Sequence, residues 1–227
     1  MRVLAIDTAL EACAAALLDT TRGALLASVS LPMTRGHAEA LMPVIETVMR
    51  DSGLAFSDLD RIAVTTGPGS FTGLRVGIAA ARGIGLAAGK PVVGLTTLAA
   101  LAAPLIAAND RLPVTAAIDA RHEHVYVQIF GPAGRTVLSA RIIPVADAVR
   151  AASAMGMMRL IGSGAGLMAA AWPPAPALHA VDDRRAADID WVARLGAAAD
   201  PKQSAPKPFY LRAPDAQPQD AAQLPRR

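Results

Sequence analysis

The chain has 227 residues, of which 53% are hydrophobic, enough to fill the core of one large domain or two small lobes. Its longest apolar run, at 98–108, is far shorter than the roughly 18 residues that a membrane span needs, so we expect no transmembrane helix. The N-terminus enters a strand pattern without the apolar run of a signal peptide. The net charge of +3 comes from scattered arginines, which do not indicate a nucleic-acid-binding arm. The single cysteine, Cys13, fits a reducing cytoplasm.

The first half of the chain predicts a mixed α/β lobe. Apolar runs at 3–7, 12–18 and 24–31 predict a meander of three strands. Between 37 and 52 the apolar residues fall on one face of a helix, which Gly53 can end. The remaining elements are a strand at 62–65, a glycine turn, a helix at 71–88 that stops at Gly89, and a strand at 92–95.

The second half begins like the first. Asp119 lies 112 residues after Asp7, each at the end of an apolar run, and Pro144 lies the same distance after Pro32. Two landmarks at one offset predict an internal duplication. A second glycine turn at 160–166 follows at a shorter offset, so we expect the second copy to have lost residues. We therefore predict an α/β protein with a first lobe at 1–98, a degenerate second lobe at 99–200 and a proline-rich, extended tail at 201–227 whose far end is disordered.

The glycine turn, TGPGSFTG at 66–73, fits neither common nucleotide motif. It has no lysine for a Walker phosphate loop, and its last glycine, Gly73, comes one residue late for the dinucleotide fingerprint. Ser70 can cap the helix that follows, at a place that also attracts anions. Two interpretations stay open: a structural turn, or a vestigial anion site that contains Asp7, Gly67, Gly69 and Ser70.

The helix behind the turn carries a stripe of small residues: Gly73, Gly77, Ala81 and Gly85 recur every four positions. Because a glycine inside a helix costs about 1 kcal/mol relative to alanine, we expect close packing against this stripe. Its partner is either the protein's own sheet or a helix of another chain. Leu74 lies beside the stripe.

Other polar residues give weaker signals. His122 and His124 stand two apart on an expected strand and could point the same way, but no third metal ligand accompanies them. His37 and Glu39 lack the Pro-Cys-x-x-Cys segment of a zinc deaminase, and they more simply begin a helix. Ser70 has neither a nucleophile elbow nor a nearby base.

Several segments together resemble a known family. They are LAIDTALEAC at 4–13, GHAEALMP at 36–43, TGPGSFTGLRVG at 66–77, IDARHEHVYV at 118–127 and PFYLR at 208–212. They are similar to the TsaB family of the bacterial tRNA threonylcarbamoyladenosine machinery. The resemblance implies a two-lobed, actin-like (ribonuclease H-like) duplicated fold of the actin, Hsp70 and sugar kinase superfamily. It also implies a partner, the catalytic relative TsaD, and work alongside the ATPase TsaE.

Departures from the catalytic relative bear on activity. TsaD has an HxEGH metal motif after its glycine turn. Counted without gaps from the shared turn, this motif corresponds to residues 97–101 of this chain, which read TLAAL. Asp7-Thr8-Ala9 also lacks the glycine that ATP-using members place two residues after the aspartate. The resemblance therefore implies no catalytic residue, metal or cofactor in this chain, and places ATP, magnesium and the metal of the complex with TsaD. His124 stands where the family usually has glutamate, and we assign it no role.

We expect this chain to be a non-catalytic subunit that binds TsaD for threonylcarbamoylation of adenosine 37 in tRNAs that read A-starting codons. The resemblance implies contact through the helices near 37–52 and 71–88, a homodimer when the partner is missing, and tRNA contact only through the complex. The interface residues that we predict are Leu41, Ile45, Val48, Gly73, Leu74, Gly77, Ile78, Ala81 and Gly85. Two alternatives stay open: an ATP-binding or metal-dependent hydrolase or phosphotransferase with Asp7, Asp119 and Ser70 in its cleft, and an RNA-binding module.

Overall fold

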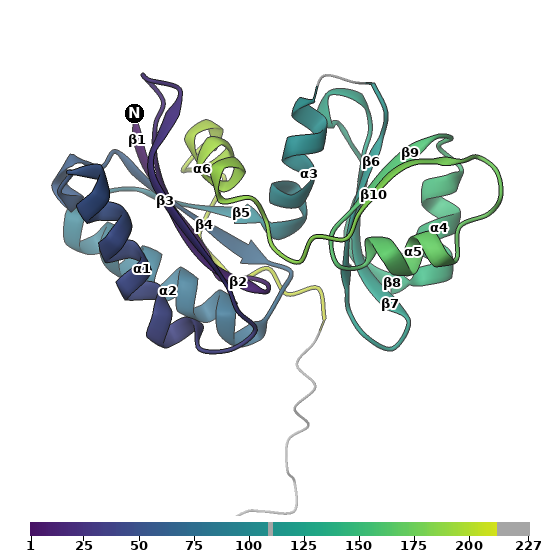
Figure 1. Cartoon of the computed structure of the whole chain (residues 1–227), viewed down its shortest axis with the longest axis horizontal. Coiled ribbons are helices and arrows are strands. Elements are labelled where there is room, and N and C mark those ends of the chain that lie inside the picture. Colours follow the sequence, from purple (N-terminus) through teal and green to yellow (C-terminus); the bar gives the residue numbers. More distant parts are fainter. Residues whose placement is uncertain (109–110, 213–227) are drawn as a thin grey trace, which may run out of the picture.

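Two lobes lie side by side in the computed structural model, which describes residues 1–108 and 111–212 (Figure 1). Each lobe is built on a five-stranded sheet with helices on its faces. Within the described ranges, no helix is both long enough and apolar enough to cross a membrane.

The first sheet has the strand order β3-β2-β1-β4-β5. Its strands are β1 (Arg2–Asp7), β2 (Ala12–Asp19), β3 (Ala24–Pro32), β4 (Arg61–Gly67) and β5 (Val92–Thr96). The first three form the predicted antiparallel meander, which is confirmed. Helix α1 (His37–Ser52) leads into β4, and helix α2 (Phe71–Ala88) leads into β5. Because each helical crossover returns the chain to the same end of the sheet, β4 pairs in parallel with β1, and β5 pairs in parallel with β4.

The second sheet repeats this plan in the order β10-β9-β6-β7-β8. Its strands are β6 (Val114–Asp119), β7 (His124–Phe130), β8 (Thr136–Pro144), β9 (Met158–Ile161) and β10 (Leu178–Asp182). Again the first three are antiparallel and the last two join in parallel, so the predicted duplication is confirmed. Its helices, α4 (Val145–Ser153) and α5 (Ala165–Ala170), have 9 and 6 residues against 16 and 18 in α1 and α2, which accounts for the shorter second copy.

Three apolar cores lie between the layers of helices and sheets. Figure 1 shows these layers. Alternate residues of each strand face opposite sides: in β1, Leu4 and Ile6 face α1 and α2, while Val3 and Ala5 face the centre of the molecule. The central core is filled by α3 (Thr97–Ala107) and α6 (Ile189–Ala198), which lie between the two sheets. The third core lies between the second sheet and α4 and α5.

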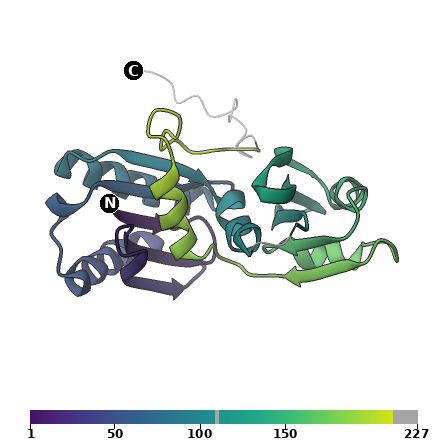
Figure 2. The ribbon, with the colours of Figure 1, turned by 90° about the horizontal axis from the view of Figure 1, so that it is seen from above.

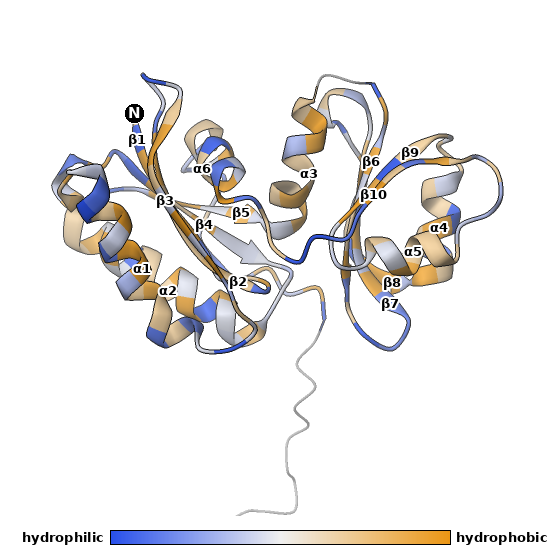
Figure 3. Cartoon of the chain, viewed as in Figure 1, coloured by the Kyte–Doolittle hydropathy of each residue, from blue (hydrophilic) through white to orange (hydrophobic). Residues whose placement is uncertain are grey.

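The position of helix α6 differs from the predicted lobe boundaries. It falls inside the range 99–200, yet it packs against β1, β2 and β4 of the first sheet. Gly196 lies against Ala63, and the Arg61 guanidinium donates to the carbonyl oxygens of Gly196, Ala197 and Ala199 at 2.6–3.0 Å. A strongly hydrophilic connector carries the chain back from β10 to α6 (Figure 3). The range 99–200 is therefore divided between the two lobes, which its composition alone does not reveal.

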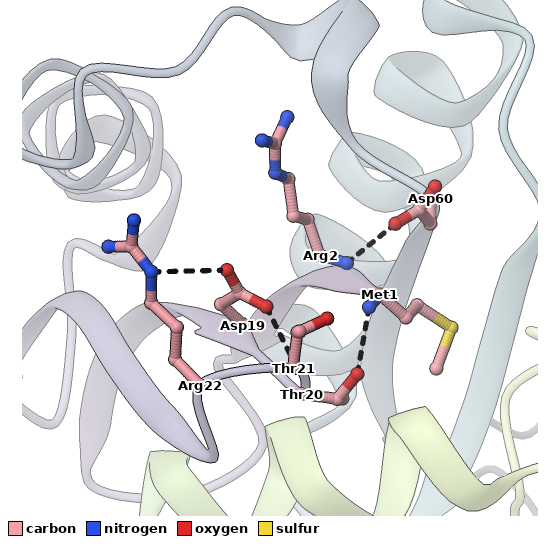
Figure 4. A network of polar contacts seen from close by, with 7 residues as sticks. All are labelled: Met1, Arg2, Asp19, Thr20, Thr21, Arg22 and Asp60. Carbon is pink, nitrogen blue, oxygen red and sulfur yellow. Dashed lines mark hydrogen bonds and ion pairs between the residues drawn. The ribbon is translucent and has the colours of Figure 1, made fainter.

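A polar network ties the start of the first sheet together (Figure 4). The Met1 ammonium donates to Thr20 Oγ1 at 2.8 Å, and Arg2 N donates to Asp60 Oδ2 at 2.7 Å. The backbone N–H of Thr21 lowers the pKa of Asp19 by donating to its carboxylate. These contacts hold the end of β1 that lies opposite to Asp7.

The C-terminal segment (residues 200–212) follows an irregular path from the first lobe toward the second (Figure 2). Ser204 O accepts from Gly94 N, and Phe209 N donates to Thr66 O, both at 2.8 Å. At its end, the Arg212 guanidinium donates to Ala120 O of the second lobe at 3.2 Å. The predicted disorder of the far end of the tail concerns residues 213–227, which lie outside the described part.

Candidate functional site

The glycine turn connects β4 to α2, as predicted. Ser70 is the N-cap of α2, and its side-chain oxygen accepts from Gly73 N at 3.2 Å. The turn lies directly against the loop between β1 and β2: Ser70 N donates to Ala9 O at 2.8 Å, and Thr8 Oγ1 donates to Gly73 O at 2.7 Å. The chain's own backbone therefore occupies the inner side of the turn.

Close backbone approach explains two of the glycines. A Cβ atom on Gly69 would collide with the carbonyl oxygen of Ala9, and one on Gly73 would collide with that of Thr8. Gly67 has a left-handed φ of +116°, a conformation that glycine adopts easily. The space between the β1–β2 loop and this turn is thus filled by packed chain.

Asp7 is fully buried beneath the turn. Its Oδ1 accepts from Ala9 N at 3.0 Å and from Thr65 Oγ1 at 2.5 Å, while Oδ2 has no hydrogen-bond partner among the described residues. Burial raises the pKa of Asp7, and the bonds from Thr65 and Ala9 oppose this only in part. Burial, with the nearby Asp7 charge as a smaller cause, also raises the pKa of Cys13 to about 11.

Replacing Asp7 by asparagine should make the protein's stability less dependent on pH. Because the folded state raises the pKa of Asp7, this group's contribution is fully present below the ordinary pKa of 3.8 and is lost as pH rises through the raised value. Urea unfolding of wild type and Asp7→Asn should give similar free energies at pH 4 and a more stable variant at pH 8. A variant that is less stable than wild type at pH 8 would show that the carboxylate is needed there in its charged form.

Asp119, the counterpart of Asp7, is exposed at the end of β6. Its Oδ1 accepts from Arg121 N at 2.7 Å, and its backbone N–H donates to Ser163 Oγ at 3.2 Å. Asp119 and Ser70 both line the cleft between the lobes, but Asp7 does not reach it. The expectation that all three line one cleft is therefore wrong, because Asp7 is covered by packed chain.

The structure separates the histidines that the sequence places close together. The expectation that His122 and His124 share a strand is wrong: residues 121–123 form a left-handed turn with φ from +51° to +63°, and β7 begins only at His124. His124 Nδ1 lies 2.7 Å from His122 O. His37 is buried at the start of α1 with Nε2 3.1 Å from Leu10 O, while Glu39 is exposed in the first turn, as expected of a helix start. In the described ranges no three His, Cys, Asp or Glu residues are grouped to hold a metal.

The stripe of small residues on α2 faces the protein's own first sheet. Gly77 lies against Thr8 and Val64, and Gly85 lies against Val92. The remaining residues that we predicted for a partner interface are also buried in this core: Leu41, Ile45, Val48, Gly73, Leu74, Ile78 and Ala81. Their assignment to an interface is therefore wrong, because the side chains that occupy this position come from the same chain.

The opposite sides of the two helices form an exposed surface, which we call the outer face; it is mostly apolar on α2 and mixed with charged residues on α1. On α2 it contains Phe71, Ala79, Gly83 and Leu86, and on α1 it contains Met42. Leu86 is 87% exposed, more than any other large apolar residue in the described part of the chain. The sequence already indicates this surface, because α2 has only two charged residues, Arg75 and Arg82, so apolar residues make up most of its exposed side as well as its buried side.

An aromatic cluster joins the C-terminal segment to the outer face. The rings of Tyr210 and Phe71 stack with centroids 5.5 Å apart, and the Arg75 guanidinium lies 3.7 Å above the Phe71 ring. Arg75 Nε also donates to the Tyr210 hydroxyl at 3.3 Å. Phe71 and Tyr210 are each nearly half exposed, so the cluster adds aromatic and charged groups to one end of the outer face.

Known proteins share this sequence and this fold. Residues 25–164 match the family model described as TsaD, tRNA N6-adenosine threonylcarbamoyltransferase. The chain is 41% identical over 126 residues to a protein of Escherichia coli named tRNA threonylcarbamoyladenosine biosynthesis protein TsaB, a match that spans 56% of this chain but only about half (53%) of that relative.

Solved structures agree with the sequence matches. A structure described as YeaZ from Pseudomonas aeruginosa superposes with a TM-score of 0.74 and 30% identity, covering 92% of this chain and 99% of that one. A ROK hexokinase from Thermus thermophilus superposes with a TM-score of 0.50 at 16% identity, covering 87% and 99% of the two chains, which shows a shared fold alone.

Proposed function

This chain belongs to the tRNA N6-adenosine threonylcarbamoyltransferase (TsaD) family and matches its TsaB members, and we propose that it is the non-catalytic partner subunit of TsaD. In this role it holds TsaD in an active form for threonylcarbamoylation of adenosine 37 in tRNAs that read A-starting codons. TsaD carries the catalytic residues, and the ATPase TsaE acts on the pair.

The close packing of the β1–β2 hairpin against the glycine turn is the observation that carries the non-catalytic part of this proposal. Ala9 and Thr8 pack against Gly69 and Gly73, so no phosphate group fits between the hairpin and the turn. Asp7 is buried below them and does not line the cleft. The chain also lacks the histidine pair of the HxEGH motif at residues 97–101, where α3 begins instead.

The outer face supports docking of TsaD on α1 and α2. Exposed Leu86 and Met42 offer apolar side chains, while Ala79 and Gly83 allow another helix to approach closely. Aromatic and arginine side chains such as Tyr210 and Arg75 are the types that dominate binding energy at interfaces. We therefore propose that the interface lies on the outer face of these helices, opposite to the buried stripe.

The proposal assigns every cofactor to the partner. ATP and magnesium, and the metal held by two histidines, belong to TsaD and TsaE in the complex, and tRNA meets this chain only when the complex forms. Without TsaD, the apolar outer face pairs with the same face of a second copy as a homodimer. Because the proposed substrate of the complex is tRNA, the proposal assigns the protein to the cytoplasm.

Affinity purification from the native lysate tests the proposal. The full chain serves as bait at moderate salt, and the co-purifying proteins are identified by mass spectrometry. We expect a larger relative with the HxEGH motif, and the reconstituted pair with TsaE, supplied with an activated threonylcarbamoyl donor, should threonylcarbamoylate tRNA, whereas this chain alone or TsaD alone should not. A bait that leaves this relative unbound in the lysate, or a chain that modifies tRNA by itself, would contradict the proposal.

A further inference from the structure

The second half of the C-terminal segment, residues 204–212, is fitted against the edge of the first sheet, and we call this stretch the clasp. In the described part of the chain, β5 is the last strand on its side of the first sheet. Gly94 N on the free edge of β5 donates to Ser204 O, and Phe209 N donates to Thr66 O near the end of β4. The clasp therefore covers an edge whose backbone groups would otherwise face water.

Two glycines make room for the clasp. A Cβ atom on Gly94 would lie 2.7 Å from the carbonyl oxygen of Ala205, and one on Gly67 would lie 2.9 Å from that of Phe209. Real Cβ atoms essentially never approach a backbone oxygen so closely, so a side chain at either position would displace the clasp. The clasp is thus seated against defined points on β4 and β5.

Tyr210 fastens the clasp to α2. Its ring stacks on Phe71 in the first turn of α2, and its hydroxyl oxygen accepts from Arg75 Nε at 3.3 Å. Phe71 is 47% exposed and Tyr210 is 45% exposed, so about half of each side chain still faces solvent. A partner on the outer face would bury this remaining surface, and buried aromatic side chains contribute strongly to binding.

The other end of the clasp reaches the second lobe. The Arg212 guanidinium donates to Ala120 O directly after β6. Ala120 N donates to His124 O at 2.9 Å, so Ala120 belongs to the turn that joins β6 to β7. One short stretch of chain therefore connects the outer face of α2, two strands of the first sheet and a turn of the second lobe.

We propose that the clasp closes when TsaD docks on the outer face, and that Tyr210 couples the two events; this inference rests on the proposed docking of TsaD. In the closed state the clasp is bonded to Thr66, Gly94 and Ala120, and in the open state these groups meet water. Only the closed state presents the stacked rings of Phe71 and Tyr210 to a partner. A partner that binds both rings therefore shifts the equilibrium toward the closed state. Docking on the first lobe thereby also fixes a turn of the second.

Amide hydrogen exchange of the full chain, followed by mass spectrometry at single-residue resolution, measures opening of the clasp. The reporter is the Gly94 amide, because its bond to Ser204 O exists only in the closed state. Tyr210→Ala should speed exchange at Gly94 at least tenfold and leave exchange in β1 unchanged, which shows that the fold is intact. The matched control is Phe56→Ala, which removes another partly exposed aromatic ring of the first lobe, outside the clasp. Wild-type exchange at Gly94 in the Tyr210→Ala protein would overturn the role of Tyr210.

Adding TsaD to saturation tests the coupling. In wild type it should slow exchange at Gly94 at least tenfold, although Gly94 lies on β5 and not on the outer face. In Tyr210→Ala protein saturated with TsaD, exchange at Gly94 should stay fast. Arg212→Ala separates the two ends of the clasp: bound TsaD should slow exchange at Gly94 but not at Ala120.

Three outcomes would contradict these expectations. Bound TsaD that leaves exchange at Gly94 unchanged in wild type, or slows it equally in Tyr210→Ala protein, would overturn the coupling. Equal slowing at Ala120 in wild type and in Arg212→Ala protein would overturn the link to the second lobe. Failure of TsaD to bind wild type at all would instead contradict the proposed function, and the coupling would fall with it.

Discussion

Gly83→Arg should weaken binding of TsaD at least about 100-fold and leave the protein folded. Gly83 lies on the outer face of α2, and a Cβ atom added there would meet no atom within 4 Å, so the arginine side chain extends into solvent in the free protein. In the complex it would hold an uncompensated charge inside an apolar interface, which costs several kcal/mol. Calorimetry or surface plasmon resonance with purified TsaD measures the loss.

The matched control is Gly166→Arg. Gly166 is also an exposed helical glycine with open space around it, but it lies on α5 of the second lobe. We expect wild-type affinity from this variant. If folded Gly83→Arg protein binds TsaD as tightly as the control does, the outer face of α2 is not the docking surface.

Gly73→Ala should lower the free energy of unfolding by about 3 kcal/mol, the upper part of the range for overpacked cores. The added Cβ collides with the backbone carbonyl of Thr8, which cannot rotate away, and the Thr8 to Gly73 hydrogen bond must lengthen. For a chain of this length the melting temperature should fall by about 6 to 12 °C. Urea or thermal unfolding followed by circular dichroism measures both quantities.

Gly83→Ala provides the comparison on the same helix. Here the Cβ meets no atom, so alanine should stabilise α2 by up to about 1 kcal/mol through its higher helix propensity. Opposite signs at Gly73 and Gly83 would confirm that the stripe packs within the chain. Equal, small effects at both positions would mean that the stripe has room for side chains and does not form part of the core.

The sequence predicts most of the fold because its signals are local. The ends of α2 follow from a Ser70 cap and a left-handed Gly89, and both lie where they were expected. The meander follows from three apolar runs with a turn between the last two. The duplication follows from aspartates at one offset, and the matching sheet orders confirm it.

What the sequence does not predict depends on contacts between distant residues. A stripe such as Gly73, Gly77 and Gly85 shows that something lies close, but not whether it belongs to the same chain. Likewise, nothing local in α6 tells which sheet it will cover, because the contact between Gly196 and Ala63 spans most of the sequence. The left-handed turn at 121–123 moves His122 off its expected strand without any glycine to signal it.

The return of α6 to the first sheet has a consequence for the order of synthesis. When residues 1–98 have left the ribosome, α1 and α2 can already cover one face of their sheet, while Val3, Ala5 and Ala63 on the other face still await α6. That helix ends at Ala198, so the central core closes only when nearly the whole chain has been translated. The first lobe is therefore made first and completed last, and during this interval its open face requires protection from aggregation.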